Sequence, residues 1–228
     1  MKIKKTIYLL KLLLSVFIFG IIGCVTPGLY SVNIYYDADK VVVPEHFKAG
    51  KNSNIIISVA EFNDTRQIDD QLVIGRVTET DGSKVLLLPK SIKATKAIAN
   101  GIKEYLRKAG YKVPNKIEQW DLKEQNIPQG VANIIIGGSI EDLDISCSKG
   151  FPTNSCRTNI KLNFVFADMT KKKIFYESRV ESNYSKEYAL FSEEALGEQA
   201  GIALGDAIEK LFAEKAVAQK IKEVTGQL

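Results

Sequence analysis

Few residues in this chain of 228 have side chains that could carry out covalent chemistry. They are three cysteines, Cys24, Cys147 and Cys156, and the single histidine, His46. A Ser-His-Asp or Cys-His site would have to use His46, which lies in the Pro-, Gly- and Lys-rich stretch PEHFKAGKNS. A zinc cluster lacks ligands, and no Walker-type or GxGxxG phosphate loop occurs. The sequence therefore predicts no enzyme, no cofactor and no metal site.

Cys147 and Cys156 are the pair best placed to react with each other, because only the eight residues SKGFPTNS separate them. Gly150 and Pro152 in this stretch favour a turn between strands that we expect to be antiparallel neighbours. An exported chain with one remaining pair of cysteines most simply forms one disulfide. We therefore expect a hairpin loop clipped by a disulfide, with residues 148–155 as a candidate contact surface.

Charged side chains are candidates for binding rather than for catalysis. Asp64 and Arg66 could form a ligand clamp, or they could form an ion pair that caps a loop. Glu141, Asp142 and Asp144 lie near a predicted strand end but lack the spacing of an EF-hand. We interpret these three acids as charges that discourage pairing at a sheet edge.

The first 23 residues are typical of a secretory signal peptide. Lys2, Lys4, Lys5 and Lys11 precede the uncharged run LLLSVFIFGII, and no acid occurs before it. As a helix this run would span about 16 Å, which is too short for a bilayer core of roughly 30 Å. We therefore expect residues 1–23 to be removed rather than to stay as a transmembrane anchor.

The residues at the end of this run, Ile21-Ile22-Gly23-Cys24, resemble the lipobox of bacterial lipoproteins. In that family the cysteine receives a diacylglyceryl group and the signal is cut just before it. The resemblance implies that Cys24 becomes the lipidated first residue and holds the protein on a membrane. Val25 follows, where an Asp would resemble an inner-membrane retention signal. We therefore expect a lipid-anchored, periplasm-facing outer-membrane protein of a Gram-negative-type bacterium.

The positive net charge of the whole chain comes from the predicted signal peptide. The chain has 31 basic and 27 acidic side chains, and the signal holds four lysines and no acid. The mature chain is therefore neutral, which does not indicate a nucleic-acid partner. Residues 24–53 are expected to be a lipidated tether, loose on the surface, in which the alternation from Tyr30 to Tyr36 allows a short edge strand. Residues 54–228 are expected to form one domain.

Within this domain the hydrophobic pattern predicts both strands and helices. β-Branched and apolar runs, alternating over parts of their length, predict the strands, and three- and four-residue spacing of apolar side chains predicts the helices. The expected strands are 54–62, 71–77, 85–89, 131–146, 158–168 and 174–184, and the expected helices run from 90 to 109 and onward from 192. The predicted fold class is α+β: an antiparallel or mixed sheet of about four to five strands with two helices packed on one face.

Two sets of glycines interrupt these elements. The pair at 137–138 predicts a bulge or bend in a strand. Gly197, Gly201 and Gly205 repeat every four residues in the last helix, where each costs up to ~1 kcal/mol relative to alanine. Such a row needs a compensating contact. We expect close packing onto the sheet, with a helix–helix dimer face as the alternative.

The FNDTR element, followed by IG, LLLP and an amphipathic helix ending in AGY, resembles the YajG family of bacterial lipoproteins. The match covers roughly residues 54–113, and the CSKGFPTNSC loop is a departure from the family. The matching positions are Asp64, Arg66, Ile74, Gly75, Gly110 and Tyr111. The resemblance implies a membrane-anchored, periplasm-facing module without catalytic residues, and it makes Asp64, Arg66 and Gly75 candidate binding residues.

The sequence thus predicts a non-enzymatic, lipid-anchored envelope lipoprotein that acts as a binding or assembly module. Its partners would be the membrane, through the N-terminal lipid, and an envelope protein or glycan. The order of elements is also similar to that of auxiliary lipoproteins of ABC-type envelope transporters. The alternative is therefore an auxiliary lipoprotein subunit of an ABC-type lipid transporter, which an open apolar groove between sheet and helices would favour.

Overall fold

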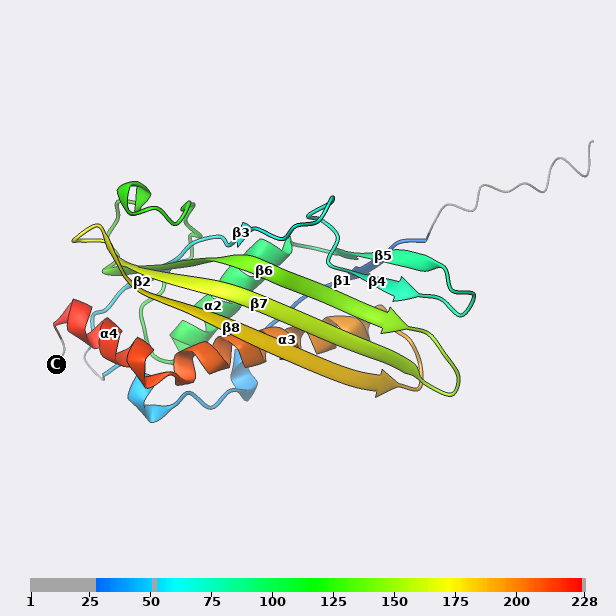
Figure 1. Cartoon of the computed structure of the whole chain (residues 1–228). Helices are drawn as coiled ribbons and strands as arrows, with labels where there is room; N and C mark the ends of the chain where they lie inside the picture. The colour runs from blue at the N-terminus through cyan, green and yellow to red at the C-terminus, as the bar shows by residue number, and fades with distance from the viewer. Residues whose placement is uncertain (1–27, 51–52, 227–228) are drawn as a thin grey trace, which may run out of the picture.

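The computed structural model describes residues 28–50 and 53–226, in which a long mixed sheet carries helices on one face (Figure 1). The helices and 3-10 turns are η1 (Ala38–Lys40), η2 (Glu45–Phe47), α2 (Ala94–Lys108), η3 (Glu124–Asn126), α3 (Glu193–Ala213) and α4 (Lys215–Thr225). The strands are β1 (Tyr30–Val32), β2 (Ile57–Val59), β3 (Asn63–Asp64), β4 (Gly75–Thr78), β5 (Lys84–Pro89), β6 (Ile134–Ser148), β7 (Asn154–Asp168) and β8 (Lys173–Tyr188).

Three long strands form the centre of the sheet. β6, β7 and β8 are joined as an antiparallel meander, as the alternation of their apolar side chains predicts. On the other side of β6, β2 and β3 run parallel to its first half and β4 runs parallel to its last residues. β5 then pairs with β4, and β1 pairs parallel with β5 at the edge. The mixed sheet and the α+β class are thereby confirmed.

The prediction of four to five strands is wrong, because the described residues form eight. The expected segments 54–62 and 71–77 and the possible edge strand near Tyr30 correspond to β2, β4 and β1, which have only three or four residues each, and β3, with two residues, is the strand without an expected counterpart. Alternation with period two cannot be recognised over so few positions. β3 exists because β6 offers it hydrogen-bonding partners, which is information that lies far away in the sequence.

The bulge in β6 does not lie at the glycines. The register against β7 shifts at Glu141 instead of at 137–138. Gly138 is required by packing, since a Cβ there would lie 2.2 Å from the carbonyl oxygen of Asn163 and 2.5 Å from the ring of Phe62. The glycine thus allows an aromatic side chain to lie flat against the strand.

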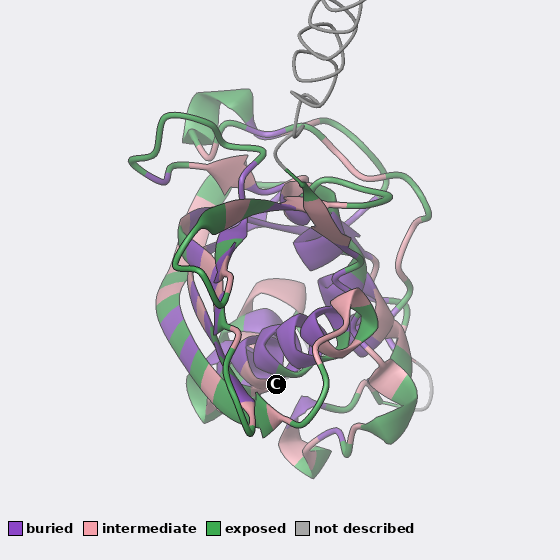
Figure 2. Cartoon of the chain, turned by 90° about the vertical axis from the view of Figure 1, so that its right-hand side faces the viewer, coloured by how far each residue is buried: buried purple, intermediate pink, exposed green. Residues whose placement is uncertain are grey.

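Helices α2 and α3 cover the concave face of the sheet, where the buried side chains gather (Figure 2). α3 begins at Ser192, whose hydroxyl accepts a hydrogen bond from the N–H of Ala195 at 3.0 Å, as a helix N-cap should. The rings of Tyr105 from α2 and Phe212 from α3 stack with centroids 4.7 Å apart. The two predicted helices on one face are confirmed, and the structure adds α4 after a break at Glu214.

The outer face of the sheet is covered only near one end. Trp120, in the polar connector after α2, packs with Ile135 and Val165 in a second, smaller core. Its indole N–H donates to the carbonyl oxygen of Lys123 at 3.0 Å, so the ring is both buried and hydrogen-bonded. Helices and connector thus enclose the sheet from both sides at that end.

The N-terminal segment differs from the loose tether expected for residues 24–53. Its described part contains the expected edge strand, β1, and continues along α3 in an extended form (Figure 1). Val32, Ile34, Tyr36 and Phe47 are buried in the main core. The alternate apolar positions of this segment therefore pack inside the domain, although the chain looks polar and turn-rich around them.

Candidate binding groove

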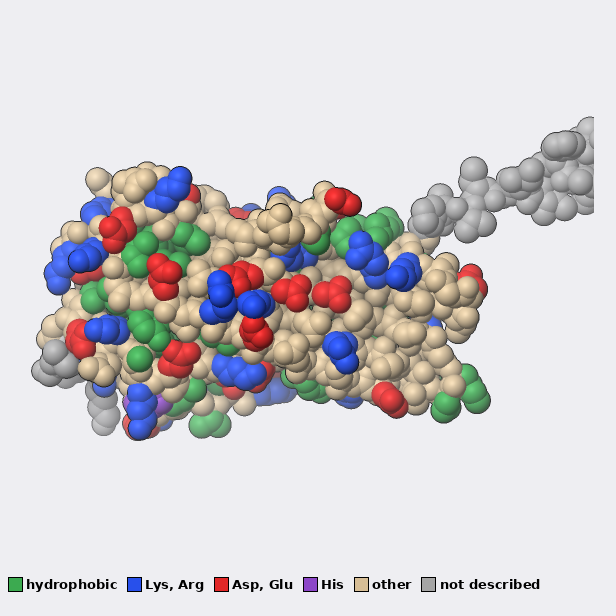
Figure 3. Space-filling view, in the orientation of Figure 1, with side chains coloured by type: hydrophobic (Ala, Val, Ile, Leu, Met, Phe, Trp, Pro, Cys, Tyr) green, Lys and Arg blue, Asp and Glu red, His purple; other side chains and the backbone are tan. Residues whose placement is uncertain are grey.

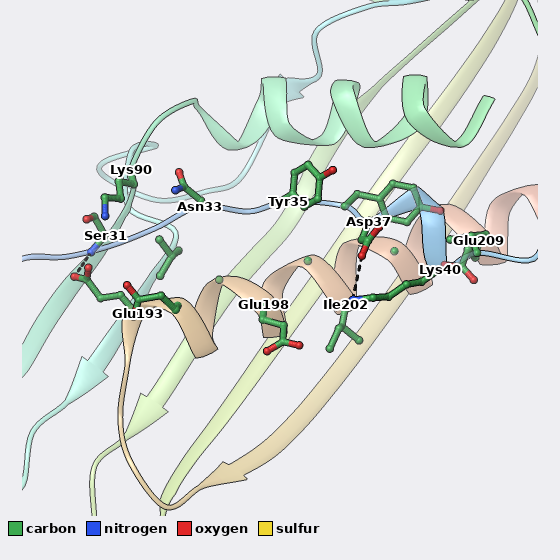
Figure 4. Close-up of a pocket in the computed structure, with 17 residues that line it drawn as sticks. Ser31, Asn33, Tyr35, Asp37, Lys40, Lys90, Glu193, Glu198, Ile202 and Glu209 are labelled. Carbon is green, nitrogen blue, oxygen red and sulfur yellow. Dashed lines mark hydrogen bonds and ion pairs between the residues drawn. The ribbon is translucent and has the colours of Figure 1, made fainter. Parts of the chain in front are cut away.

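A groove of about 680 Å³ lies between the extended N-terminal segment, residues 31–41, and α3 (Figure 4). The residues labelled in the close-up are Ser31, Asn33, Tyr35, Asp37, Lys40, Lys90, Glu193, Glu198, Ile202 and Glu209. Segment and helix lie side by side over this length. The groove is therefore elongated rather than round.

The row of glycines in α3 forms the floor of the groove. A Cβ on Gly197 would lie 2.7 Å from the carbonyl oxygen of Asn33, and one on Gly201 would lie 2.1 Å from that of Tyr35. A Cβ on Gly205 would lie 3.1 Å from an aromatic ring of the same segment. The expectation that this row packs onto the sheet is therefore wrong. The glycines let the N-terminal segment approach α3 at backbone distance.

Acidic side chains outnumber basic ones along the groove. The acids are Asp37, Glu193, Glu194, Glu198 and Glu209, and the bases are Lys40 and Lys90. Glu193 accepts a hydrogen bond from the backbone N–H of Ser31 at 2.8 Å. Asp37 and Lys40 form an exposed ion pair at 3.0 Å. The excess of carboxylates makes the groove attractive to positively charged groups.

Two buried tyrosine hydroxyl groups lie near Glu209, one of the residues that line the groove. Tyr36 is only 4% exposed, and neither its hydroxyl nor that of Tyr105 has a hydrogen-bond partner among the described residues. Burial, reinforced by the nearby carboxylate of Glu209, raises the pKa of both tyrosines, so they remain hydrogen-bond donors. Burial, together with Asp206, also raises the pKa of Glu209. A buried donor without an acceptor costs about 1–3 kcal/mol.

The groove is equipped for noncovalent binding. Tyr35 and Ile202 offer exposed apolar surface between the carboxylates. None of the residues that line the groove is a cysteine or a histidine. Across residues 28–50 and 53–226, no three His, Cys, Asp or Glu side chains gather as a metal site would require. The lining can hold a cation and an apolar side chain, and it can donate a hydrogen bond from a tyrosine.

Asp64 and Arg66, predicted as a pair, do come together, but outside this groove. Two guanidinium nitrogens of Arg66 donate to the Asp64 carboxylate at 2.7 and 2.9 Å, and the side chains are 3% and 10% exposed. The remaining N–H groups donate to the carbonyl oxygens of Gln71, Val73 and Leu143 at 2.8, 2.9 and 3.1 Å. All five donors of the guanidinium are used. This geometry favours the loop-capping alternative over a ligand clamp.

Gly75, the third candidate, lies at the start of β4. A Cβ at this position would lie 2.0 Å from the carbonyl oxygen of Ile145, so only glycine allows β4 to approach β6 so closely. Gly75 also borders a separate pocket of about 470 Å³ that contains Asp142 and Asp144. Burial and the neighbouring Asp142 raise the pKa of Asp144. Binding at this pocket remains a prediction.

The predicted disulfide is present. Cys147 and Cys156 face each other across the β6–β7 hairpin with their Cα atoms 4.0 Å apart, and they are bonded. Cys24 lies outside the described residues, and its acylation stays a prediction. Within the ranges that the structure describes, no helix combines the length and the apolar character needed to cross a bilayer.

The sequence does not predict the groove, although it carries a signal for each of its two walls. The alternating side chains around Val32 and Tyr36 indicated a strand, and the glycine row indicated a close contact for the last helix. The signal in the sequence is that the alternating segment and the glycine row each need another segment to pack against. Nothing local in the sequence shows that the two patterns are partners of each other.

No protein-family model and no curated protein matches the chain. Among solved structures, protein XCC0632 from Xanthomonas campestris, of the DUF330 family, is similar with a TM-score of 0.51 and 10% identity, over 86% of this chain and 99% of that chain. The PelC dodecamer from Paraburkholderia phytofirmans has a TM-score of 0.36 and 10% identity, over 68% and 86% of the two chains. The C-terminal domain of LpoB from Salmonella enterica has a TM-score of 0.26 and 8% identity, over 59% and 86%.

The likeness to XCC0632 is a likeness of fold, since so low an identity carries no residue roles with it. It covers nearly all of that chain, so the arrangement of sheet and helices described above is a complete fold shared by another protein. None of these matches is specific to the YajG family, which stays a resemblance of short motifs.

Proposed function

We propose that the protein is a non-enzymatic, lipid-anchored lipoprotein of the outer membrane that faces the periplasm and binds a partner protein. Its lipid would be carried by Cys24. The groove between the N-terminal segment and α3 would hold an extended, positively charged segment of that partner. A protein that acts only by binding needs such a surface and no reacting group.

The observation that carries this proposal is the composition of the groove. Carboxylates of α3, among them Glu194, Glu198 and Glu209, lie along it and outnumber the lysines. Lysine or arginine side chains of a partner would pair with the carboxylates. An extended basic peptide presents such side chains along its length.

The length of the groove also fits an extended peptide. From Glu193 to Glu209 the helix advances about 24 Å at ~1.5 Å per residue. An extended chain covers that distance with about seven residues at ~3.3 Å each. Exposed apolar side chains at Tyr35 and Ile202 could receive alternate side chains of such a segment.

The alternative, an auxiliary subunit of an ABC-type lipid transporter, would gain support from an apolar groove between sheet and helices. That interface is filled instead by aromatic side chains. Phe62, Phe164, Phe166, Phe212 and Tyr105 are all fully buried there. Permease and ATPase genes beside the gene would favour a protein-binding role within a transporter.

Site-specific photocrosslinking in cells tests the proposal. A photoreactive phenylalanine analogue replaces Ile202 in the groove, and in the matched control it replaces Glu177, an exposed residue of β8 opposite Val165. We expect position 202, and not 177, to crosslink to one envelope protein through a segment rich in lysine and arginine. Glu198→Lys should lower the yield about tenfold, the effect of ~1.4 kcal/mol, and Glu177→Lys should not.

Two results would contradict the proposal. Equal crosslinking from positions 202 and 177 would mean that the groove is not a specific site. Capture of a glycan or of a segment without basic residues would mean that the carboxylates do not select the partner. Neither result bears on whether Cys24 carries a lipid.

A further inference from the structure

Apolar side chains are exposed at the end of the domain from which the N-terminal chain emerges (Figure 3). Leu29 is 61% exposed at the start of the described chain, and Phe151 is 99% exposed in the β6–β7 hairpin loop. Leu190, in the connection from β8 to α3, is 84% exposed. Figure 1 shows that these three segments all lie at the right-hand end of the sheet.

A cluster of four side chains holds these segments in fixed positions. The rings of Tyr30 and Phe191 meet with centroids 4.9 Å apart. The ammonium of Lys149 lies 4.1 Å from the Phe191 ring centroid and 3.0 Å from the carboxylate of Glu79, which also accepts from the Tyr30 hydroxyl at 2.7 Å. Each exposed apolar residue is one or two positions from a member of this cluster. The apolar residues therefore lie around this cluster, at the same end of the domain.

The hairpin that carries Phe151 is itself braced. The disulfide between Cys147 and Cys156 closes its base. The side-chain amide of Asn154 donates to the carbonyl oxygen of Tyr188 at 3.0 Å and ties the hairpin to the end of β8. A surface that is already ordered loses little entropy when it meets a partner.

We propose that this end of the domain, formed by Leu29, Phe151 and Leu190, inserts into the outer part of the same bilayer that holds the lipid anchor. The proposal rests on the lipidation of Cys24 in the proposed function. Only four residue steps separate Cys24 from Gly28, and a fully extended chain spans about 14 Å in four steps. Cys24 would lie at the lipid surface, so the apolar end of the domain cannot be far from it.

The chemistry of this end suits a lipid interface. Leucine and phenylalanine side chains enter the boundary between headgroups and acyl chains. The ammonium of Lys149 is neutralised by Glu79, so no unpaired charge of the cluster has to be buried. Lys186, near the end of β8, lies 5.1 Å from the ring of Tyr188 and can reach phosphate groups while its stem stays on apolar surface. With this end on the bilayer, the 15 residues of β6 extend about 50 Å away from it.

Tryptophan fluorescence with brominated lipids tests this contact. The native lipoprotein carrying Phe151→Trp is placed in vesicles of phosphatidylethanolamine and phosphatidylglycerol with bromine on the acyl chains. We expect the new indole to shift to the blue and to lose about half of its emission relative to vesicles without bromine. The control variant is Val131→Trp, in the connection just before β6 and at the opposite end of the sheet, which should not be quenched.

The background is small, because Trp120 is the single tryptophan of the chain and is buried near that opposite end. Quenching of both variants, or of neither, would overturn the proposal. A partner protein that covers this end would also leave the Phe151→Trp indole unquenched in pure lipid vesicles, and that outcome too counts against insertion.

Failure of the lipid anchor can be separated from failure of the contact. Cys24 is the one cysteine outside the disulfide, so a chain that starts at Cys24 can be coupled there to a maleimide lipid. Mass spectrometry of the native N-terminal peptide reports whether cells acylate Cys24. Quenching of the coupled chain reports whether the end of the domain with Phe151 enters the bilayer, independently of whether cells acylate Cys24.

Discussion

Gly201 of α3 lies so close to Tyr35 of the N-terminal segment that a single added Cβ would come within 2.1 Å of the Tyr35 carbonyl oxygen. Two backbones far apart in the chain therefore touch without a side chain between them. This contact fixes the floor of the groove. It also makes the segment that follows the predicted anchor a structural part of the domain.

Gly201→Ala should destabilise the protein by about 1–3 kcal/mol, because the backbone of Tyr35 must move to admit the methyl group. The loss is expected even though alanine favours a helix over glycine by ~1 kcal/mol. Gly205→Ala is the matched variant, and its Cβ would meet an aromatic ring at 3.1 Å, so its effect should be smaller. Urea unfolding measures both. A Gly201→Ala protein as stable as the original would show that the segment does not lie against α3.

Arg66→Ala should cost about 3–5 kcal/mol of unfolding free energy, because it leaves the carboxylate of Asp64 buried without its partner. Arg179→Ala removes an exposed pair with Glu141 and should cost at most ~1 kcal/mol. Thermal and urea unfolding of the two variants give the comparison. If Arg66 instead clamps a ligand, its loss would abolish partner capture in a protein of unchanged stability.

Replacing both Cys147 and Cys156 by serine should lower stability by at most about 2.7 kcal/mol, the chain-entropy value for a ten-residue loop. The loss should be smaller in practice, because β6 and β7 already restrict the loop through hydrogen bonds. Ser148 and Ser155 are the next pair in register, and their double replacement by alanine is the control. Two alkylated free thiols in unreduced protein from the envelope would reject the bridge.

Glu209→Gln should stabilise the protein at pH 7. Burial raises the pKa of this carboxyl in the folded state, so the folded protein takes up the proton at a higher pH than the unfolded chain does. The contribution of Glu209 to stability therefore improves as pH falls through its raised pKa toward the ordinary value of 4.5, and the Gln variant lacks this part of the pH dependence. Glu177→Gln, at an exposed position of β8, is the control for the loss of one negative charge. Parallel stability curves for Glu209→Gln and the original would contradict the assignment.

Cys24→Ser should abolish labelling by palmitate, because the thiol is the predicted acylation site. Replacing Cys147 and Cys156 together should leave the label intact, which makes that variant the control. The mature protein should also lack residues 1–23 by mass. Equal label in the original protein and in Cys24→Ser would contradict the anchor prediction. The proposed bilayer contact would then be tested only with the chain that is chemically coupled to a lipid.

The parts of the fold that sequence predicts are those with local causes. α3 begins where Ser192 can cap it, and α2 ends just before Gly110, whose φ of 91° suits glycine. The long strands show their alternation over many residues. The disulfide follows from two cysteines on neighbouring strands of one hairpin.

The parts that escaped prediction depend on contacts between distant segments. β3 is a strand only because β6 lies beside it, and two residues carry no period of their own. Of the candidate site residues, Asp64 and Arg66 were recognised as a pair because only Thr65 separates them in the chain. Tyr36 and Glu209, which lie at the end of the groove, are brought together by the glycine row. Composition and periodicity do not encode such a pairing.

The parallel pairing of β1 with β5 has a mechanical consequence for a protein held at its N-terminus. A pull at Gly28 along the axis of β1 loads the hydrogen bonds to β5 in shear, so that they must break together. The same pull drags the backbone of Tyr35 lengthwise over Gly201, where there is no room for it to tilt out of line. A force on the N-terminus in this direction would therefore act where the attachment of the N-terminal segment is strongest. The domain would stay folded while the chain that links it to the membrane is under tension.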